Sequence, residues 1–411
     1  MAQRHLDPTD RAPAKATAHP QPYPHPHPAS DTDALASYLR AQATEFLRAL
    51  RQHREPGASP NGASPATRSA TPPAPPTTHV DTARALRRAA RRLSGTLHTF
   101  QPLLDTDWAE GMRPELAWLS GTLAMEHAYA SRLDRLLQAL HRLSGSSPLP
   151  SPRPVSGRTT ATAPPPTTPP TAHPDRGNLT VGAAKAGALL DRQLTLARTR
   201  AHSTALQALG SSRFHAVADK VALLASEVPL RTTGPLTAPA TATPTDLGPL
   251  ATAAEDRLTD AVAALPLVTA GSPYNAQALV HGLSPDPSPH PQDAPWHQVR
   301  LLLRLHRYAL EVLTGEHTGR TGHTGHTAGT SDTAPDDDCA DVRLLAAGEA
   351  LDRHRDASEA AAAAAQAART PRIAPATAYA LGVLHADQRH EVEAARYAFQ
   401  HSWHKEPIRL P

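Results

Sequence analysis

Basic side chains recur at one spacing in two distant parts of this 411-residue chain. One set begins at Arg84 and continues with arginines three and seven residues later, and the other begins at His297 with arginines at the same offsets. Residues at these offsets share one face of a helix. Because a guanidinium keeps its charge and binds oxyanions through paired donors, the pattern indicates anion binding. Its repetition indicates an internal duplication.

The first set belongs to a predicted helix over about 80–104 whose two faces differ sharply. Its apolar face carries Leu86, Ala90, Leu93, Leu97 and Phe100, and its opposite face carries Arg84, Arg87, Arg88, Arg91 and Arg92. An ordinary solvated face is the alternative, but such faces mix charge signs. No acidic residue stands between Asp81 and Asp105. The face is therefore predicted to bind an anion.

The second set belongs to a predicted helix over 295–313 that is apolar nearly all round and should be largely buried. One seam is the exception, and it carries His297, Arg300, Arg304 and Arg307. Nothing acidic precedes Glu311 on this helix. Since isolated buried guanidiniums are costly, the seam must meet carboxylates, water or an external anion.

The elements that position these residues are predicted to be helices throughout, which makes the fold class all-α. Hydrophobic residues make up 39% of the chain and aromatic residues only 4%. The core must therefore be built from Leu, Ala and Val, and no segment alternates as a half-buried strand does. The 3.6-residue periodicity predicts helices over 31–54, 80–104, 107–119, 121–143, 183–209, 211–227, 246–264, 295–313, 340–369 and 375–404.

Proline marks the segments between the helices. The chain has 43 prolines, about twice the ordinary share. Residues 1–30 are predicted to be a disordered Pro/His-rich tail. A helical domain is predicted over 31–405, with an N-terminal half at 31–230 and a C-terminal half at 245–405. Low-complexity insertions are expected near 55–78, 144–180, 231–247, 266–295 and 314–338.

Several classes of site are disfavoured by residue type. A single cysteine, Cys339, excludes a disulfide framework and a cysteine-based zinc site. The candidate metal-binding histidines lie in low-complexity repeats, so no metal or cofactor is predicted: His25, His27, His317, His323 and His326. No P-loop or HExxH motif is present, and we expect no catalysis.

No run approaches the ~20 apolar residues of a membrane span. The N-terminus has no apolar signal core, so an intracellular protein is expected.

The two predicted basic helices resemble the signatures of a known family, the conserved histidine α-helical domain (CHAD) family. The strings RALRRAARRLSGTLHTFQPLL (84–104) and WHQVRLLLRLHRYALEVL (296–313) are similar to its two signatures. LDRHRDA (351–357) and YALGVLHADQRHEVEAARYAFQHSW (379–403) follow in the family's order. The sequence departs from the family pattern at Arg84, where the first signature has histidine, and at Leu301 and Leu305, where the second has basic residues.

The resemblance implies a domain of two pseudo-symmetric helical bundles around a basic cleft that binds inorganic polyphosphate without hydrolysing it. A linear polyphosphate needs many cations along a groove, and binding should weaken with salt. The residues predicted to bind it are Arg84, Arg87, Arg88, Arg91, Arg92, His297, Arg300, Arg304, Arg307, His354, His385 and Arg389. A cytoplasmic location, with association with polyphosphate granules, is expected.

Two alternatives remain open on the sequence. The chain is a structural or partner-binding helical protein if the divergent signatures have lost the ligand. Non-specific nucleic-acid binding is the third candidate, and a weaker one, because 4% aromatic residues leave few platforms on which bases stack.

Overall fold

The computed structural model describes residues 31–54, 77–145, 174–231, 246–272, 275–283, 290–321 and 335–403. These residues form α-helices and short 3-10 helices, and no strand is present among them. Their one β-type pairing is an isolated antiparallel bridge between Leu104 and Leu230. The all-α prediction is confirmed.

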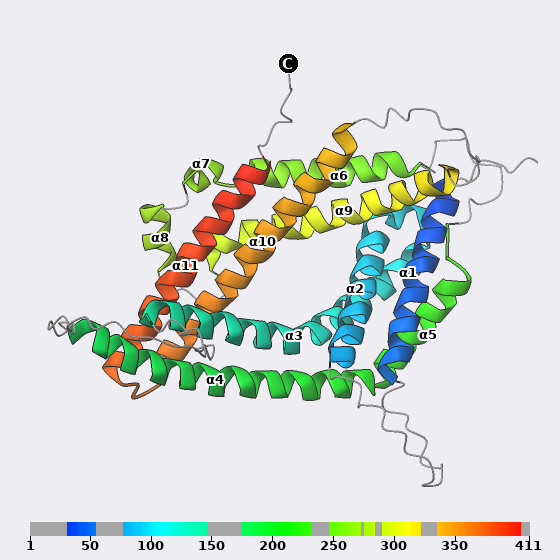
Figure 1. Ribbon diagram of the computed structural model, residues 1–411. Coiled ribbons are helices and arrows are strands. Elements are labelled where there is room, and N and C mark those ends of the chain that lie inside the picture. The colour runs from blue at the N-terminus through cyan, green and yellow to red at the C-terminus, as the bar shows by residue number, and fades with distance from the viewer. Residues whose placement is uncertain are drawn as a thin grey trace, which may run out of the picture.

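The helices lie along the sides of a four-sided frame (Figure 1). One end of the frame is built by three helices that pack together: α1 (Asp31–Arg54), α2 (Thr77–Thr99) and α5 (Ser212–Ser226). A long side is the pair α3 (Thr106–Ser144) and α4 (Pro174–Leu209). This pair runs from the α1–α2 end to the opposite end.

The other two sides come from the C-terminal part of the chain. The opposite end is the pair α10 (Pro335–Ala368) and α11 (Pro375–Trp403), and the second long side is the pair α6 (Leu247–Ala263) and α9 (Ala294–Thr321). Short elements complete the described chain: η2 (Gln101–Leu103), α7 (Leu267–Ala270), α8 (Ala276–Gly282) and η3 (Pro291–Asp293). No helix in the described ranges is both long and apolar enough to cross a membrane.

Helix α3 differs from its prediction because it is one helix rather than two. Its N-terminus is capped by Asp105, whose carboxylate accepts a hydrogen bond from the backbone N–H of Trp108. It ends at Gly145, which has the left-handed φ of 71°. The predicted break at 120 is absent because Ser120 is buried in the helix and accepts a hydrogen bond from Arg91 of α2. Tertiary packing thus outweighs the weak helix propensity at this point.

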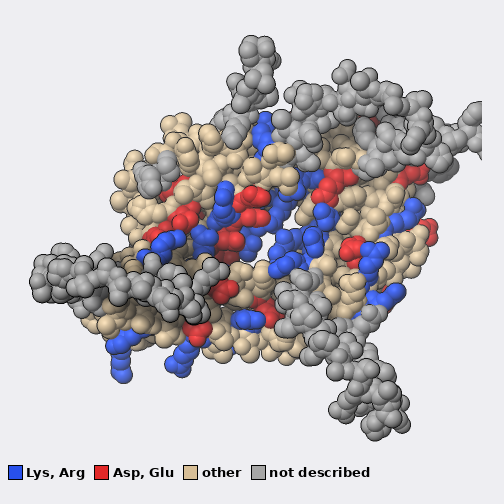
Figure 2. Space-filling view, viewed as in Figure 1, with Lys and Arg blue, Asp and Glu red and all other residues tan. Residues whose placement is uncertain are grey.

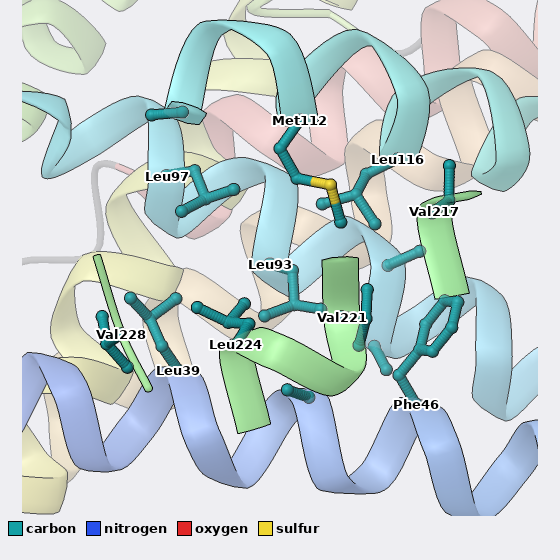
Figure 3. Packing of buried hydrophobic residues seen from close by; sticks show 14 of the residues in the cluster. Leu39, Phe46, Leu93, Leu97, Met112, Leu116, Val217, Val221, Leu224 and Val228 are labelled. Atoms are coloured by element: carbon teal, nitrogen blue, oxygen red, sulfur yellow. The ribbon is translucent and has the colours of Figure 1, made fainter. Parts of the chain in front are cut away.

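Buried side chains form three clusters. The first fills the end of the frame where α1, α2 and α5 meet α3, with Leu39, Phe46, Leu93, Met112 and Val221 among its members (Figure 3). The second joins the C-terminal part of α3 and the N-terminal part of α4 to α10 and α11. The third joins α6 and α9 to α10 and α11 through Trp296 and Phe399.

The clusters do not follow the predicted division into two halves. The first cluster, mostly from 31–230, also contains Leu247, Ala309 and Val312. The second combines Leu136 and Leu190 with residues of α10 and α11. The ends of α3 and α4 therefore share a core with the C-terminal helices, and the chain packs as one body.

The stretch 266–295 also differs from the sequence prediction. It was predicted as an insertion, but its described residues include α7, α8 and η3, and Ala270, Ala278 and Asp293 are buried. Its described prolines, Pro266, Pro291 and Pro295, stand at the starts of α7, η3 and α9, where a missing N–H costs little. The tail at 1–30 and most of the other predicted insertions, namely 55–76, 146–173, 232–245 and 322–334, lie outside the described residues.

Candidate functional site

The two signature helices, α2 and α9, are held in direct contact. A Cβ atom placed on Gly95 of α2 would lie 2.5 Å from the ring of Tyr308, so only glycine permits this approach. Nearby, Arg92 of α2 forms a bidentate pair with Glu311 of α9 through bonds of 2.8 and 3.2 Å. This contact aligns the arginine faces of the two helices.

Five arginines from three helices converge beside this contact, and we call them the arginine cluster: Arg87 and Arg91 of α2, Arg300 and Arg304 of α9, and Arg355 of α10. Burial is the main cause that lowers the pKa of Arg87, and Arg355, Arg304 and Arg300 lower it further because they lie close to it. Figure 2 shows basic side chains gathered around the hollow at the centre of the molecule. Four of the five were predicted from the sequence.

The cluster is partly desolvated, and its positive charges are incompletely balanced. Burial, followed by Arg87 and Arg304, lowers the pKa of Arg91 to about 10. Burial and Arg304 likewise lower the pKa of Arg300 to about 10, although Asp352 opposes the shift. Both side chains remain charged at neutral pH, but the protein holds that charge at a cost in free energy.

Two acidic residues of α10 meet one part of the cluster. Asp352 Oδ1 accepts from Arg300 Nε at 2.5 Å and from Arg304 Nη2 at 2.8 Å. Glu359 pairs with Arg355 at 2.7 Å, and Arg132 of α3 also donates to it. The basic seam of α9 therefore pairs with a carboxylate, which is one of the three kinds of partner predicted for it from the sequence. The Asp352 side chain is still 51% exposed, so its contacts border solvent.

The other part of the cluster has no carboxylate. Arg91 donates to the hydroxyl of Ser120 at 3.2 Å, and neither Arg87 nor Arg91 forms an ion pair with any described residue. A cavity of about 570 Å³ adjoins Arg87. Arg84 and His127 also line it, and burial and these two arginines lower the pKa of His127.

Three further predicted residues of the signature helices lie apart from this cluster. Arg88 is exposed, and Arg92 is taken up by its pair with Glu311. Arg307 is half-buried beside Gly348 of α10. The helix over 295–313 was predicted to be largely buried, but Pro295, Gln298 and Leu301 are exposed, Leu301 by 53%.

His354 and Arg389, both predicted as ligand contacts, are instead parts of a buried network. Each is at most 2% exposed. Arg389 donates two hydrogen bonds to Asp293, at 2.7 and 3.2 Å, and Arg396 donates a third at 2.6 Å. Arg396 also donates to His354 Nε2 at 3.3 Å. A ligand at the surface does not reach side chains held in this way.

The network pairs two arginines with two carboxylates, because Arg396 also donates to Glu393 at 2.7 Å. Burial would raise the pKa of Asp293, but the bonds from Arg389 outweigh it and hold that pKa at about 2. Burial and Arg396 hold the pKa of His354 well below its ordinary value, so the imidazole is neutral. His354 stacks on Trp296 with ring centroids 5.6 Å apart. His297, which is half-buried, meets its edge at 5.5 Å. His385 lies elsewhere, in a separate pocket with Arg389.

Sequence reasoning missed Arg355, Asp352 and Asp293. The first two stand in the segment LDRHRDA, and the i, i+4 pair of Arg355 with Glu359 on a helix was a readable signal. Asp293 stands in a stretch predicted as an insertion, and its role depends on residues about one hundred positions away. No cluster of three or more potential metal ligands occurs among the described residues.

Comparisons with known proteins identify the family of this chain. The family model of the CHAD domain matches residues 75–328. The solved structure "PptA from Streptomyces chartreusis" is 62% identical over 92% of this chain and 100% of its own, with a TM-score of 0.64. "Crystal structure of the CHAD domain from the plant Ricinus communis" matches at 16% identity and a TM-score of 0.45, over 92% and 93% of the two chains. No curated protein matches. This chain belongs to the CHAD domain family.

Proposed function

We propose that this protein binds inorganic polyphosphate in a basic cleft whose wall is the arginine cluster, without hydrolysing it. The observation that carries the proposal is the pair Arg87 and Arg91, which face three further arginines with no carboxylate partner among the described residues. Like charges held together in a partly desolvated place are relieved by a bound anion. Membership in a family whose signatures imply polyphosphate binding supports this choice of anion.

The number of arginines in the cluster favours a polymer over a single phosphate. Its five arginines come from α2, α9 and α10 and together carry more donors than one phosphate accepts. Each guanidinium can bind two oxygens of one phosphate or bridge neighbouring phosphates. A chain of phosphates gains several such contacts for one loss of translational freedom. Each contact also releases counterions from the polymer.

Hydrolysis is not part of the proposal because the two acids that form ion pairs with the cluster are already in use. Asp352 is bound by Arg300 and Arg304, and Glu359 is bound by Arg355 and Arg132. Burial would raise the pKa of both carboxyls, but their arginine partners outweigh it and lower those pKa values. Carboxylates held ionised by arginines are poor general acids. Association with polyphosphate granules in the cytoplasm is an extension of the proposal.

Two adjacent arginines provide a matched test. Arg87→Ala and Arg88→Ala remove the same charge from the same helix, but only Arg87 belongs to the cluster. Affinity for long-chain polyphosphate should fall about tenfold or more in Arg87→Ala at low salt and far less in Arg88→Ala. The slope of log affinity against log salt should become shallower by somewhat under one unit in Arg87→Ala.

The alternatives give different results in the same experiment. Equal affinities of both variants, with unchanged helix content, would assign the cluster to structure. Displacement of polyphosphate by single-stranded DNA of equal charge would favour a general polyanion site. Release of phosphate from the polymer during incubation would contradict a purely binding role.

A further inference from the structure

One cavity of the molecule combines an aliphatic wall with positive charge. It is the cavity of about 570 Å³ that adjoins Arg87, at the corner of the frame where α1 and α2 approach α3 and α4 (Figure 1). Most of its aliphatic wall comes from α3 and α4 and is formed by Leu123, Ala130, Ala205, Leu206 and Leu209. Leu123 and Ala205 are each only 8% exposed, whereas Leu206 is 53% exposed. The wall therefore extends from the protein interior to solvent.

Inorganic polyphosphate gains nothing from this wall. Its surface consists of charged oxygen atoms, which lose hydration against aliphatic carbon and receive no hydrogen bond in return. A ligand that buries an alkyl chain there gains about fourfold in affinity for each methylene removed from water. The wall therefore suits a ligand that carries an apolar group.

The apolar group that fits this wall best is an alkyl chain rather than a nucleobase. Among the described residues that line the cavity, none is Phe, Tyr or Trp, so a base finds few ring faces on which to stack. The carboxylate that could pair with the edge of a base belongs to Glu126, and it already lies 2.9 Å from His202 Nδ1. An alkyl chain needs neither a ring face nor a hydrogen-bond partner.

The charge around the cavity favours an anionic head group on its α2 side. Arg84 and Arg87 of α2 line the cavity, as does Arg198 of α4. Glu126 is the one acid among the described lining residues, and Arg198 Nε lies 3.9 Å from it. Arg87 forms no ion pair with any described residue. An anion is therefore attracted to Arg87, where no carboxylate competes for the guanidinium.

We propose that this cavity binds a medium-chain aliphatic anion, with its alkyl chain on the leucine and alanine wall and its head group on Arg87. The cavity volume lies within the range of small-molecule sites, about 300–1,000 Å³. The ligand is either a fatty-acid carboxylate or an alkyl phosphate, which share the alkyl chain and the anionic head group. Arg87 is the one member of the arginine cluster that lines the cavity, so the inference goes beyond polyphosphate binding and does not depend on it.

Calorimetric titration of the full chain tests the site, with sodium hexanoate, octanoate and decanoate below the concentrations at which they form micelles. Affinity should rise about fourfold for each added methylene from hexanoate to octanoate, and decanoate should bind at least as tightly as octanoate. Leu206→Ser should lower the affinity for decanoate about fivefold or more. Leu196→Ser is the matched control, because Leu196 is 49% exposed on the same helix and does not line the cavity.

Arg87→Ala tests the position of the head group. It should weaken binding of octanoate about tenfold and leave binding of octanol, which has the same chain length without the charge, unchanged. A comparison of decanoate with decyl phosphate identifies the head group that the wild type prefers. Tighter binding of either one supports the proposal, provided that Leu206→Ser weakens it.

Any of three results would overturn the proposal. They are an affinity that does not change with chain length, equal losses in Leu206→Ser and Leu196→Ser, and an equal weakening of octanol and octanoate binding by Arg87→Ala. Polyphosphate is absent from all these titrations, so their outcome stands whether or not polyphosphate binds to the arginine cluster.

Discussion

Arg92 of α2 and Glu311 of α9 are 219 residues apart in the chain and form a two-bonded ion pair. Tyr38 of α1 donates to the same carboxylate at 2.8 Å, so Glu311 ties three helices together. Burial would lower the pKa of Arg92, but its bonds to Glu311 outweigh it and raise that pKa. We therefore expect Arg92 to act in packing rather than in ligand binding.

Arg92→Ala should destabilise the protein without weakening polyphosphate binding. Because both side chains of the pair are about one-third exposed, at 32% and 30%, we expect a loss of about 1 kcal/mol in the free energy of unfolding. Urea denaturation measures the loss, and Arg88→Ala is the charge-matched control. A fall in polyphosphate affinity larger than that of Arg88→Ala would show that Arg92 contacts the ligand.

Arg91→Met should stabilise the free protein and weaken ligand binding. Burial and the neighbouring arginines hold the pKa of Arg91 at about 10, below its unfolded value, so the charge opposes folding. Methionine keeps the apolar stem and removes the charge, and the free energy of unfolding should rise by about 1 kcal/mol at low salt. Saturating polyphosphate should reverse the order of Tm values. If the ligand-free variant melts below the wild type at low salt, the cluster is not electrostatically strained.

Asp352→Asn should tighten polyphosphate binding. Burial would raise the pKa of Asp352, but Arg300 and Arg304 outweigh it and lower that pKa, so the carboxylate competes with an anion for the same donors. We expect an affinity gain of about threefold to tenfold at low salt, which should shrink as salt screens the charges. Glu349→Gln is the control, since Glu349 is an exposed acid on the same helix. An equal gain in both variants would reflect net charge alone.

The buried Asp293 should make the protein sensitive to acid. Its pKa is about 2 in the folded state, against 3.8 for the unperturbed carboxyl, so the folded state favours the ionised form. That stability is fully present above about pH 4 and is lost as pH falls toward 2. Asp293→Asn should lose this pH dependence and about 3–5 kcal/mol at neutral pH, because Arg389 and Arg396 lose a buried counter-charge. Parallel pH profiles of unfolding in variant and wild type would contradict the assignment.

The sequence by itself determined the helices, and with them the fold class, because their apolar spacing is a local property. Leu86, Leu93 and Leu97 were predicted on one stripe of α2, and all three are fully buried. The seam of α9 was likewise predicted to need a partner, because a buried guanidinium requires one whatever the fold. Such conclusions need only the period of a helix and the cost of desolvating a charge.

Only the tertiary structure decided what each charged side chain does. Arg91 and Arg92 are adjacent and chemically identical, yet one enters the arginine cluster and the other pairs with Glu311. Likewise, Arg389 is buried because Asp293 lies opposite it in the folded chain, 96 residues away in the sequence. The free energy of an ion pair depends on the distance and solvent exposure of both partners. Helical periodicity places a residue on a face, but it does not say which acid or arginine from a distant segment packs against that face.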